Sequence, residues 1–98
     1  MPDNFYGTGR RKSSVARVTI TEGNGKFTFN GKDLEQYFPS PSMKMTIEKP
    51  FKVVSLEGKF DMVVNVNGSG LSAQSDAVAL GISRALIKMD PELRPKLK

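Results

Sequence analysis

The feature that most constrains the fold of this chain is a strand signal followed directly by a helix signal. Apolar and polar side chains alternate through residues 60–67, which predicts a β-strand with one buried face. After a glycine-rich turn at residues 68–70, an apolar stripe at helical spacing predicts a helix over residues 72–88. Elements with one apolar side bury it by packing in layers, so we expect a sheet covered by a helix.

The side chains that should form this contact can be named. The strand is expected to turn inward Phe60, Met62, Val64 and Val66. The stripe of the helix is expected to comprise Ala77, Val78, Leu80, Ile82, Ala85, Leu86 and Met89, whereas Gln74, Asp76, Ser83, Arg84 and Lys88 should lie off it. Gly81 costs about 1 kcal/mol relative to Ala within a helix, and we expect close packing on the sheet to explain it.

The first third of the chain adds three shorter strand signals. Residues 5–10 can form an extended segment, and residues 15–21 alternate with Ala16, Val18 and Ile20 inward. Residues 26–30 resume the alternation with two inward phenylalanines. Because Asn24-Gly25 tolerates the positive φ angles of tight turns, we predict that residues 22–25 join the second and third segments as a β-hairpin.

The remaining signals predict short helices. Residues 33–38 favour a helical turn, and Ser42 can cap a helix from residue 43 to about residue 48, which Pro50 should stop. Asp90 and Pro91 are typical of the cap and first position of a short last helix. The sequence therefore predicts one α+β domain over residues 1–98, a small mixed sheet of about four strands with helices on one face.

Charge is concentrated at the two ends of the sequence, although the net value is only +5. Residues 1–18 carry four cations against one acid, and residues 81–98 carry five against two. The segment between them has six lysines against seven acids. Cations gathered on particular segments are the footprint expected of a protein that binds a polyanion.

Missing residue types exclude several chemistries. The chain has no Cys and no His, which excludes disulfides, thiolate zinc sites and histidine-based catalysis, and we expect no metal and no cofactor. No run approaches the roughly 20 apolar residues that span a bilayer, and no apolar stretch follows a basic start. We therefore expect a soluble intracellular protein without a membrane partner.

The segment from residue 7 to residue 17 is the first candidate site. It combines two glycines, a run of three cations and short hydroxyl side chains, all of which suit phosphate oxygens. The alternative is a solvated turn whose charges serve only solubility. The candidate RNA-binding residues are Gly7, Thr8, Gly9, Arg10, Arg11, Lys12, Ser13, Ser14 and Arg17.

The glycine loop, residues 68–73, is the second candidate. It matches the G-x-G-x-x-A fingerprint between a strand and a helix, so a nucleotide-binding module or small enzyme is the alternative function. A nucleotide-binding fold of this kind needs a further strand about 20 residues later, and only Asp90-Pro91 lies there. A helix N-terminus can instead hold an RNA phosphate, or the loop is a plain turn with serine capping. The candidate residues are Gly68, Ser69, Gly70, Ser72 and Gln74.

The C-terminal cations form a third candidate group. Arg84 and Lys88 lie four residues apart on one helix face, and Arg94 follows in the basic end. They could bind phosphate or simply favour the dipole at the helix C-terminus. Tyr6 is the only aromatic residue beside the first basic run, and its role is open between RNA contact and packing.

Several motifs in order carry a resemblance to a known family. Residues 6–18, Tyr-Gly-Thr-Gly-Arg-Arg-Lys-Ser-Ser-Val-Ala-Arg-Val, resemble the N-terminal signature of the ninth protein of the small ribosomal subunit, in its bacterial or organellar form. Further matches lie at residues 23–26, 30–31, 37–39, 58–61, 64–66, 68–74 and 90–95. The resemblance covers nearly the whole chain.

This resemblance implies a non-enzymatic, structural rRNA-binding protein. It would lie in the head of the small subunit, on the 3′ major domain of the rRNA and beside other ribosomal proteins, in cytoplasmic or organellar ribosomes. The implied fold resembles domain 2 of ribosomal protein S5 and has a left-handed β-α-β crossover, against the usual rule. Family members continue into a basic tail that reaches the peptidyl-site tRNA, so the resemblance assigns no tRNA contact to residues 1–98.

Overall fold

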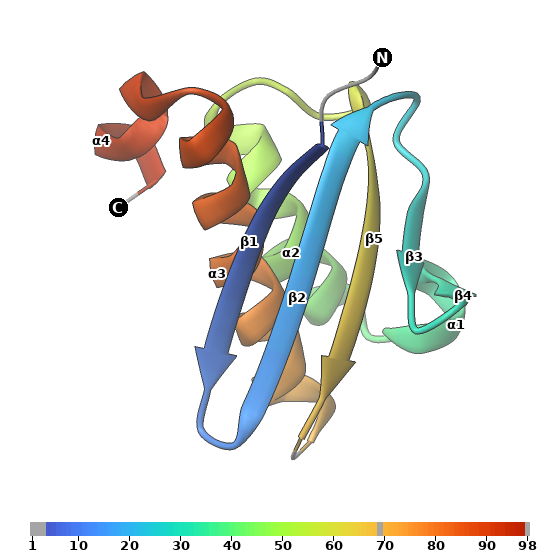
Figure 1. The fold of residues 1–98 in the computed structure, drawn as a ribbon. Coiled ribbons are helices and arrows are strands. Elements are labelled where there is room, and N and C mark those ends of the chain that lie inside the picture. Colours follow the sequence, from blue (N-terminus) through green and yellow to red (C-terminus); the bar gives the residue numbers. More distant parts are fainter. Residues whose placement is uncertain (1–3, 69, 98) are drawn as a thin grey trace.

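A computed structural model describes residues 4–68 and 70–97, which form a five-stranded mixed sheet with helices on one face (Figure 1). The strands are β1 (Asn4–Arg11), β2 (Ser14–Glu22), β3 (Phe27–Phe29), β4 (Lys32–Asp33) and β5 (Phe60–Asn67). The helices are α1 (Leu34–Tyr37), α2 (Pro41–Val53), α3 (Leu71–Met89) and α4 (Arg94–Leu97), with a 3₁₀ turn, η1 (Pro91–Leu93), before α4. The predicted α+β class is confirmed, and the additional strand is the two-residue β4.

The core lies between the sheet and α3. All the predicted inward side chains of β2, and those of β5 from Met62 onward, are buried, and Phe60 is partly buried. The buried stripe of α3 comprises Gln74, Ser75, Ala77, Val78, Gly81, Ile82, Ala85 and Leu86. Two expectations about α3 were wrong, because Leu80 is exposed and Gln74 is buried. Both corrections follow from helical geometry, because the buried pairs 74–75, 77–78, 81–82 and 85–86 share one side of the helix and residue 80 lies on the other.

The predicted hairpin between residues 15–21 and 26–30 was wrong. The strand order is β1-β2-β5-β3-β4, so β5 lies between β2 and β3. The turn after β2 carries the chain past β5, because the carboxylate of Asp61 accepts hydrogen bonds from the backbone N–H groups of Asn24 and Lys26, both at 3.0 Å. The local Asn-Gly signal could not show this partner, which is more than 30 residues away.

The tight Asn-Gly hairpin is found one turn later. Asn30 and Gly31 link β3 to β4 with φ angles of 51° and 84°, the two positive values that a type I′ turn requires. The Asn30 side chain also pairs with β5, since its amide donates to the carbonyl of Val66 at 2.7 Å and its oxygen accepts from the N–H of Val66 at 2.9 Å. Asn30 therefore fixes both the turn and its place on the sheet.

The prediction for α2 also needs correction. The helix begins at Pro41, with Ser40 rather than Ser42 at the cap position, and it continues through Pro50 to Val53. A proline inside a helix removes one backbone hydrogen bond. Here Pro50 lies in the core beside Ile47 and Phe51, and Phe51 stacks on Phe27 with ring centroids 5.4 Å apart. This burial outweighs the break that the local sequence predicts.

The crossover from β3 to β5 is left-handed. These two strands are parallel neighbours, and both run downward in Figure 1, where α2 lies behind the sheet and the chain passes from right to left. Parallel crossovers are right-handed in about 98% of cases. The handedness that the family resemblance implies is thus present in this chain.

Candidate nucleic-acid interface

The predicted basic segment forms the hairpin between β1 and β2. Arg11 pairs with Ser14, so the turn consists of Lys12 and Ser13 alone. Lys12 has a φ of 55°, whereas Ser13 does not have a positive φ, which is the pattern of a type II′ turn. We call the end of this hairpin, Arg10 to Ser14, the basic tip.

Three cations of this hairpin project into solvent. Arg10, Lys12 and Arg17 are exposed, and none has an ion-pair or hydrogen-bond partner for its side chain among the residues that the structure describes. Arg11 points to the other side of the hairpin, where its Nε lies 3.8 Å from a carboxylate oxygen of Asp76. An exposed pair at this distance is weak, so Arg11 is held only loosely.

The two glycines of the segment serve the fold. Gly7 and Gly9 are buried, and a Cβ atom at either position would overlap the backbone of α3, at Gly81 and Ala77 respectively. A Cβ atom on Gly81 would in turn come within 2.7 Å of the Val18 side chain, so the close packing predicted for Gly81 is confirmed. The absence of side chains here is explained by contact between β1 and α3. RNA contact by Gly7 and Gly9 stays a prediction.

The glycine loop lies directly beside the basic tip. A Cβ atom on Gly68 would reach the backbone of Ser13 and Ser14, although the two segments are more than 50 residues apart in sequence. Figure 1 shows both at the lower end of the molecule, where the β1–β2 turn and the start of α3 meet. The structure thus brings together the first two candidate groups. Ser69 lies outside the described residues.

The N-terminus of α3 is open toward this end. Its cap residue is Gly70, with a φ of 48° and no side-chain cap, so the described residues do not support the alternative of a turn with serine capping. The first bond of the helix runs from the N–H of Gln74 to the carbonyl of Gly70 at 3.0 Å. The preceding N–H groups have no acceptor within the helix and carry partial positive charge, which suits an anion. Ser72 is exposed within this first turn.

Gln74 holds the glycine loop from inside the protein. Its amide nitrogen donates to the carbonyl of Gly68 at 3.1 Å, and its oxygen accepts from the hydroxyl of Tyr37 at 2.8 Å. Tyr37 in turn accepts a hydrogen bond from Asn30 at 3.2 Å. This chain of contacts fixes the loop relative to the far edge of the sheet. Gln74 and the fully buried Ser14 therefore have structural roles, and RNA contact by either stays a prediction.

The C-terminal cations lie around a groove beside α3, and one of them reaches the free edge of β1. Arg84 donates from Nη1 to the carbonyl of Thr8 at 2.7 Å, which covers part of an otherwise unpaired strand edge. Lys88 and Arg94 join Arg84 around a shallow groove of about 380 Å³ with Leu80, Ile87 and Leu97. The structure therefore brings the third candidate group together, on a different part of the surface from the basic tip.

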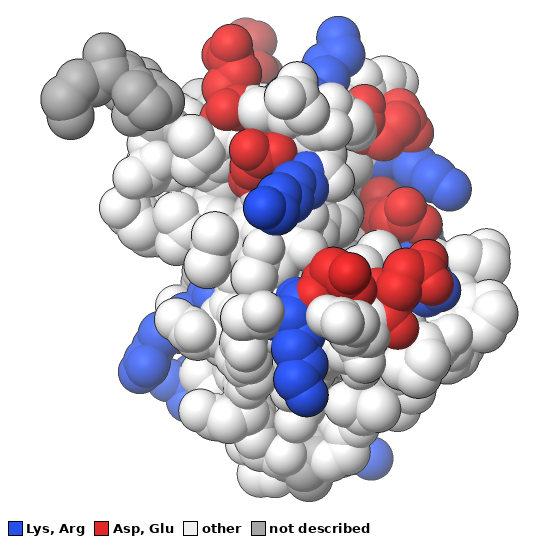
Figure 2. Space-filling view, turned by 90° about the vertical axis from the view of Figure 1, so that its right-hand side faces the viewer, with Lys and Arg blue, Asp and Glu red and all other residues white. Residues whose placement is uncertain are grey.

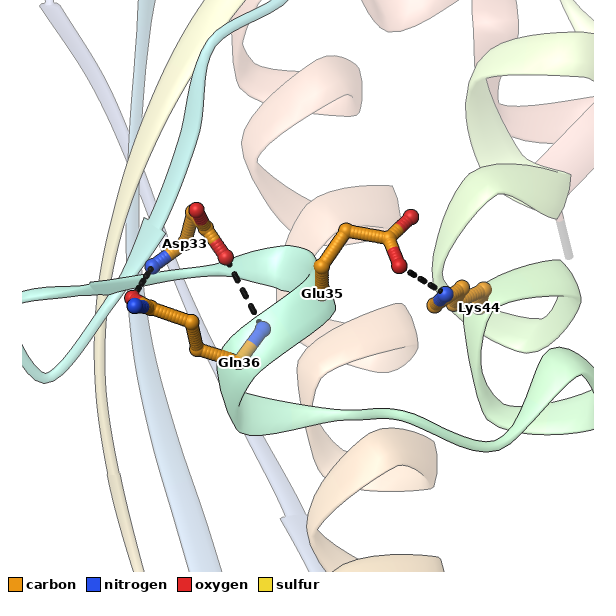
Figure 3. A network of polar contacts seen from close by, with 4 residues as sticks. All are labelled: Asp33, Glu35, Gln36 and Lys44. Carbon is orange, nitrogen blue, oxygen red and sulfur yellow. Dashed lines mark hydrogen bonds and ion pairs between the residues drawn. The ribbon is translucent and has the colours of Figure 1, made fainter.

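Acidic side chains gather at the opposite edge of the sheet. Figure 2 shows this side, where β3, β4 and α1 lie. Four carboxylates, those of Asp33, Glu35, Glu48 and Glu57, surround a cleft of about 450 Å³. Asp33 also forms a reciprocal cap with Gln36, and Glu35 binds Lys44 at 2.6 Å (Figure 3). Carboxylates thus gather at this edge, where Figure 2 also shows cationic side chains among them, whereas Arg10, Lys12 and Arg17 lie on the β1–β2 hairpin.

Outward residues of β5 were missed as candidates, although the period of two identifies them. Asn65 and Asn67 lie beside Arg17 and Val15 of β2 on the sheet face that no helix covers. We call this surface the open face. Its members are Asn4, Tyr6, Thr8, Arg10, Val15, Arg17, Thr19, Thr21, Asp61, Val63, Asn65 and Asn67. The hairpin cations therefore continue into a broader polar surface.

The alternative function, a nucleotide-binding module built on the glycine loop, lacks the surrounding fold that it needs. In the described part of the chain, α3 is followed only by η1 and α4, so no second parallel strand is present to carry a ribose ligand. The same residues contain no group of three acidic side chains placed to hold a metal ion. Nor does any described helix combine the length and hydropathy needed to cross a bilayer.

Comparison with known proteins agrees with these observations. The family described as ribosomal protein S9/S16 matches residues 9–98. The small ribosomal subunit protein uS9 of Maridesulfovibrio salexigens is 52% identical over 96 residues, which cover 98% of this chain and 74% of that relative. The similarity includes most of the β1–β2 hairpin, the glycine loop and α3.

Proposed function

This chain belongs to the ribosomal protein S9/S16 family, and from that premise we propose that it is a structural constituent of the small ribosomal subunit that binds rRNA through phosphate contacts. The family is one of structural proteins, so its contribution to translation is to hold RNA in place. The observation that carries the proposal is the meeting of the basic tip with the open N-terminus of α3.

The basic tip, together with Arg17 on β2, is suited to neutralising phosphates. Arg10, Lys12 and Arg17 need no rearrangement to meet RNA, because their side chains have no partner among the described residues. The N–H groups at the start of α3, beside Ser72, add donors fixed by the fold. A two-residue turn holds the hairpin cations, and the buried side chain of Gln74 holds the loop before α3. Little chain entropy is therefore lost when a phosphate binds to either group.

The other candidates take supporting or secondary roles in this proposal. Gly7, Gly9, Ser14 and Gln74 position the hairpin and the loop. Arg84, Lys88 and Arg94 provide a second track of positive charge along the free edge of β1. The acidic edge around β4 and α1 faces away from RNA, toward neighbouring proteins of the subunit head. We place the protein in cytoplasmic ribosomes, on the 3′ major domain of the small-subunit rRNA.

Calorimetric titration tests the proposal directly. The ligands are a fragment of the 3′ major domain of small-subunit rRNA, a set of mononucleotides and NAD. We expect binding to the rRNA fragment that weakens steeply as salt rises, and no tight nucleotide binding. Tight nucleotide binding without affinity for RNA would instead establish the dinucleotide alternative. Co-sedimentation with small subunits at moderate salt then separates a ribosomal component from an RNA adaptor that acts elsewhere.

A further inference from the structure

The open face carries an aromatic side chain that the core does not use. Tyr6 is 56% exposed, whereas Phe27, Phe29, Tyr37, Phe38, Phe51 and Phe60 pair with one another beneath the sheet. The only side-chain partner of Tyr6 among the described residues is Asn4, at a long 3.5 Å from the hydroxyl. One face of this aromatic ring is therefore available to a ligand.

Tyr6 belongs to a row of outward side chains that crosses the sheet. Tyr6 pairs with Thr19, and Thr19 pairs with Val63, which is itself 55% exposed. Tyr6 and Val63 thus stay exposed on one face with Thr19 between them, and exposed apolar side chains gathered on one face often mark a binding surface. This row lies midway along the strands, on the sheet face that no helix covers.

Charge on the open face identifies the class of ligand. The next row toward the basic tip contains Thr8, Arg17 and Asn65, and the row beyond it contains Arg10, Val15 and Asn67. Each row is about 7 Å from the last, because two residues of a strand advance by that distance. Among the β1, β2 and β5 residues of this face, the only carboxylate is that of Asp61, which lies in the row on the opposite side of Tyr6 and is bound to the turn after β2.

We propose that the open face binds an unpaired stretch of RNA, with one base stacked on Tyr6 and the flanking phosphates on Arg17 and Arg10. This inference rests on the proposed function and adds the form of RNA that is bound. Unpaired bases stack on exposed aromatic rings regardless of sequence, and cations beside the ring hold the backbone. An exposed tyrosine, followed toward the basic tip by two rows that carry Arg17, Arg10 and two Asn side chains, provides both features.

Tyrosine fluorescence makes the contact observable. The chain has no Trp and two Tyr, and the Tyr37 hydroxyl is bound inside the protein to Gln74. Titration of the whole chain with single-stranded oligouridylate at low salt should quench the emission. The quench should disappear in Tyr6→Leu, and affinity should fall about tenfold to a hundredfold, the range measured for loss of one base–aromatic stack. Tyr6→Phe should retain affinity within about twofold, because the ring remains.

Met45→Thr is the matched control, because it removes an exposed apolar side chain from α2, far from the sheet face. This variant should bind oligouridylate like the unmodified chain, and thermal unfolding should show that each variant is folded. Binding to structured rRNA with no quench by oligouridylate and no loss in Tyr6→Leu would overturn the stacking inference and leave the proposed function standing. Failure to bind either RNA would overturn the proposed function itself.

Discussion

Lys12 occupies a backbone conformation that is normally left to glycine. Its φ of 55° falls at the first loop position of a two-residue hairpin, where a side chain costs about 1–2 kcal/mol. Its ammonium group has no partner among the described residues, so nothing within the fold offsets this cost. A strained residue that the fold does not need is a reasonable candidate for a residue that binds a ligand.

Replacing Lys12 with Gly should therefore separate stability from binding. We expect Lys12→Gly to be as stable as the unmodified chain or up to about 1 kcal/mol more stable, since relief of strain exceeds the entropy cost of glycine. RNA affinity should fall, and the slope of log affinity against log salt should decrease by about 0.7–0.9 for the one lost phosphate contact. Urea unfolding and RNA titrations at several salt concentrations measure the two effects. Lower stability with unchanged RNA binding would contradict this account of Lys12.

Gly9 should behave in the opposite way. Gly9→Ala should destabilise the protein by about 1–3 kcal/mol or more, because its methyl group would overlap the backbone of α3 at Ala77, and neither backbone can move freely. Thr8→Ala is the control, since Thr8 is exposed on the same strand, and its cost should stay below about 1 kcal/mol. Thermal or urea unfolding compares the two. Equal stabilities would show that β1 and α3 are not in such close contact.

At the scale of elements, local patterns predicted the pieces more accurately than their pairing. The period of two predicted β2 and β5, and helical spacing predicted α3, because each signal reports which side of one element is buried. Strand order was not predictable, since the turn after β2 depends on Asp61 in a distant strand. The extent of α2 was missed because burial of Pro50 and Phe51 outweighs the local effect of proline.

The candidate site shows the same division. Its basic and glycine-rich segments were recognisable because the residue types themselves suit phosphate. Their adjacency was not predictable, because it depends on the pairing of β5 with β2, which brings Gly68 against the β1–β2 turn. The packing role of Gly7 and Gly9 was not predictable for a related reason, because a glycine that packs on a helix and one that approaches a ligand look alike until the neighbouring helix is known.

The connection between β2 and β3 should be sensitive to pH. Hydrogen bonds from the backbone of Lys26 and then Asn24 hold the pKa of Asp61 below its ordinary value of 3.8. A carboxyl group whose pKa is lowered by folding stabilises the protein above that ordinary value, and the effect is lost as pH falls through the lowered pKa. Asp61→Asn should therefore reduce stability most at neutral pH, and the difference should shrink as pH falls below 3.8.

Urea unfolding between pH 7 and pH 2.5 would measure this dependence. Glu57→Gln is the control, because it removes one charge from the cleft beside this turn, whereas the backbone hydrogen bonds of Asn24 and Lys26 go to Asp61. The Glu57 variant reports the effect of net charge alone. A penalty for Asp61→Asn that stays constant over the whole pH range would show that the ionised carboxylate does not hold this turn.

At the scale of the whole molecule, the central feature is the separation of charge across the sheet. Unpaired cations occupy the β1–β2 hairpin and Arg84 lies at the free edge of β1, whereas four carboxylates surround the cleft beside β4 and α1. A net charge of +5 spread evenly would attract RNA without orienting the protein. The observed arrangement should present one end of the molecule to the phosphates and the other to protein neighbours.

The most direct test of this arrangement compares two triple variants with equal loss of charge. One changes Arg10, Arg11 and Lys12 to Ala, and the other changes Lys26, Lys52 and Lys59, which are exposed and lie outside the hairpin. The measurement is the slope of log affinity against log salt for the rRNA fragment. We expect the hairpin variant to lose about 2–3 from the magnitude of this slope and the lysine variant to lose almost nothing. Equal losses in both, or an unchanged slope in the hairpin variant, would contradict the central claim that the basic tip binds RNA phosphates.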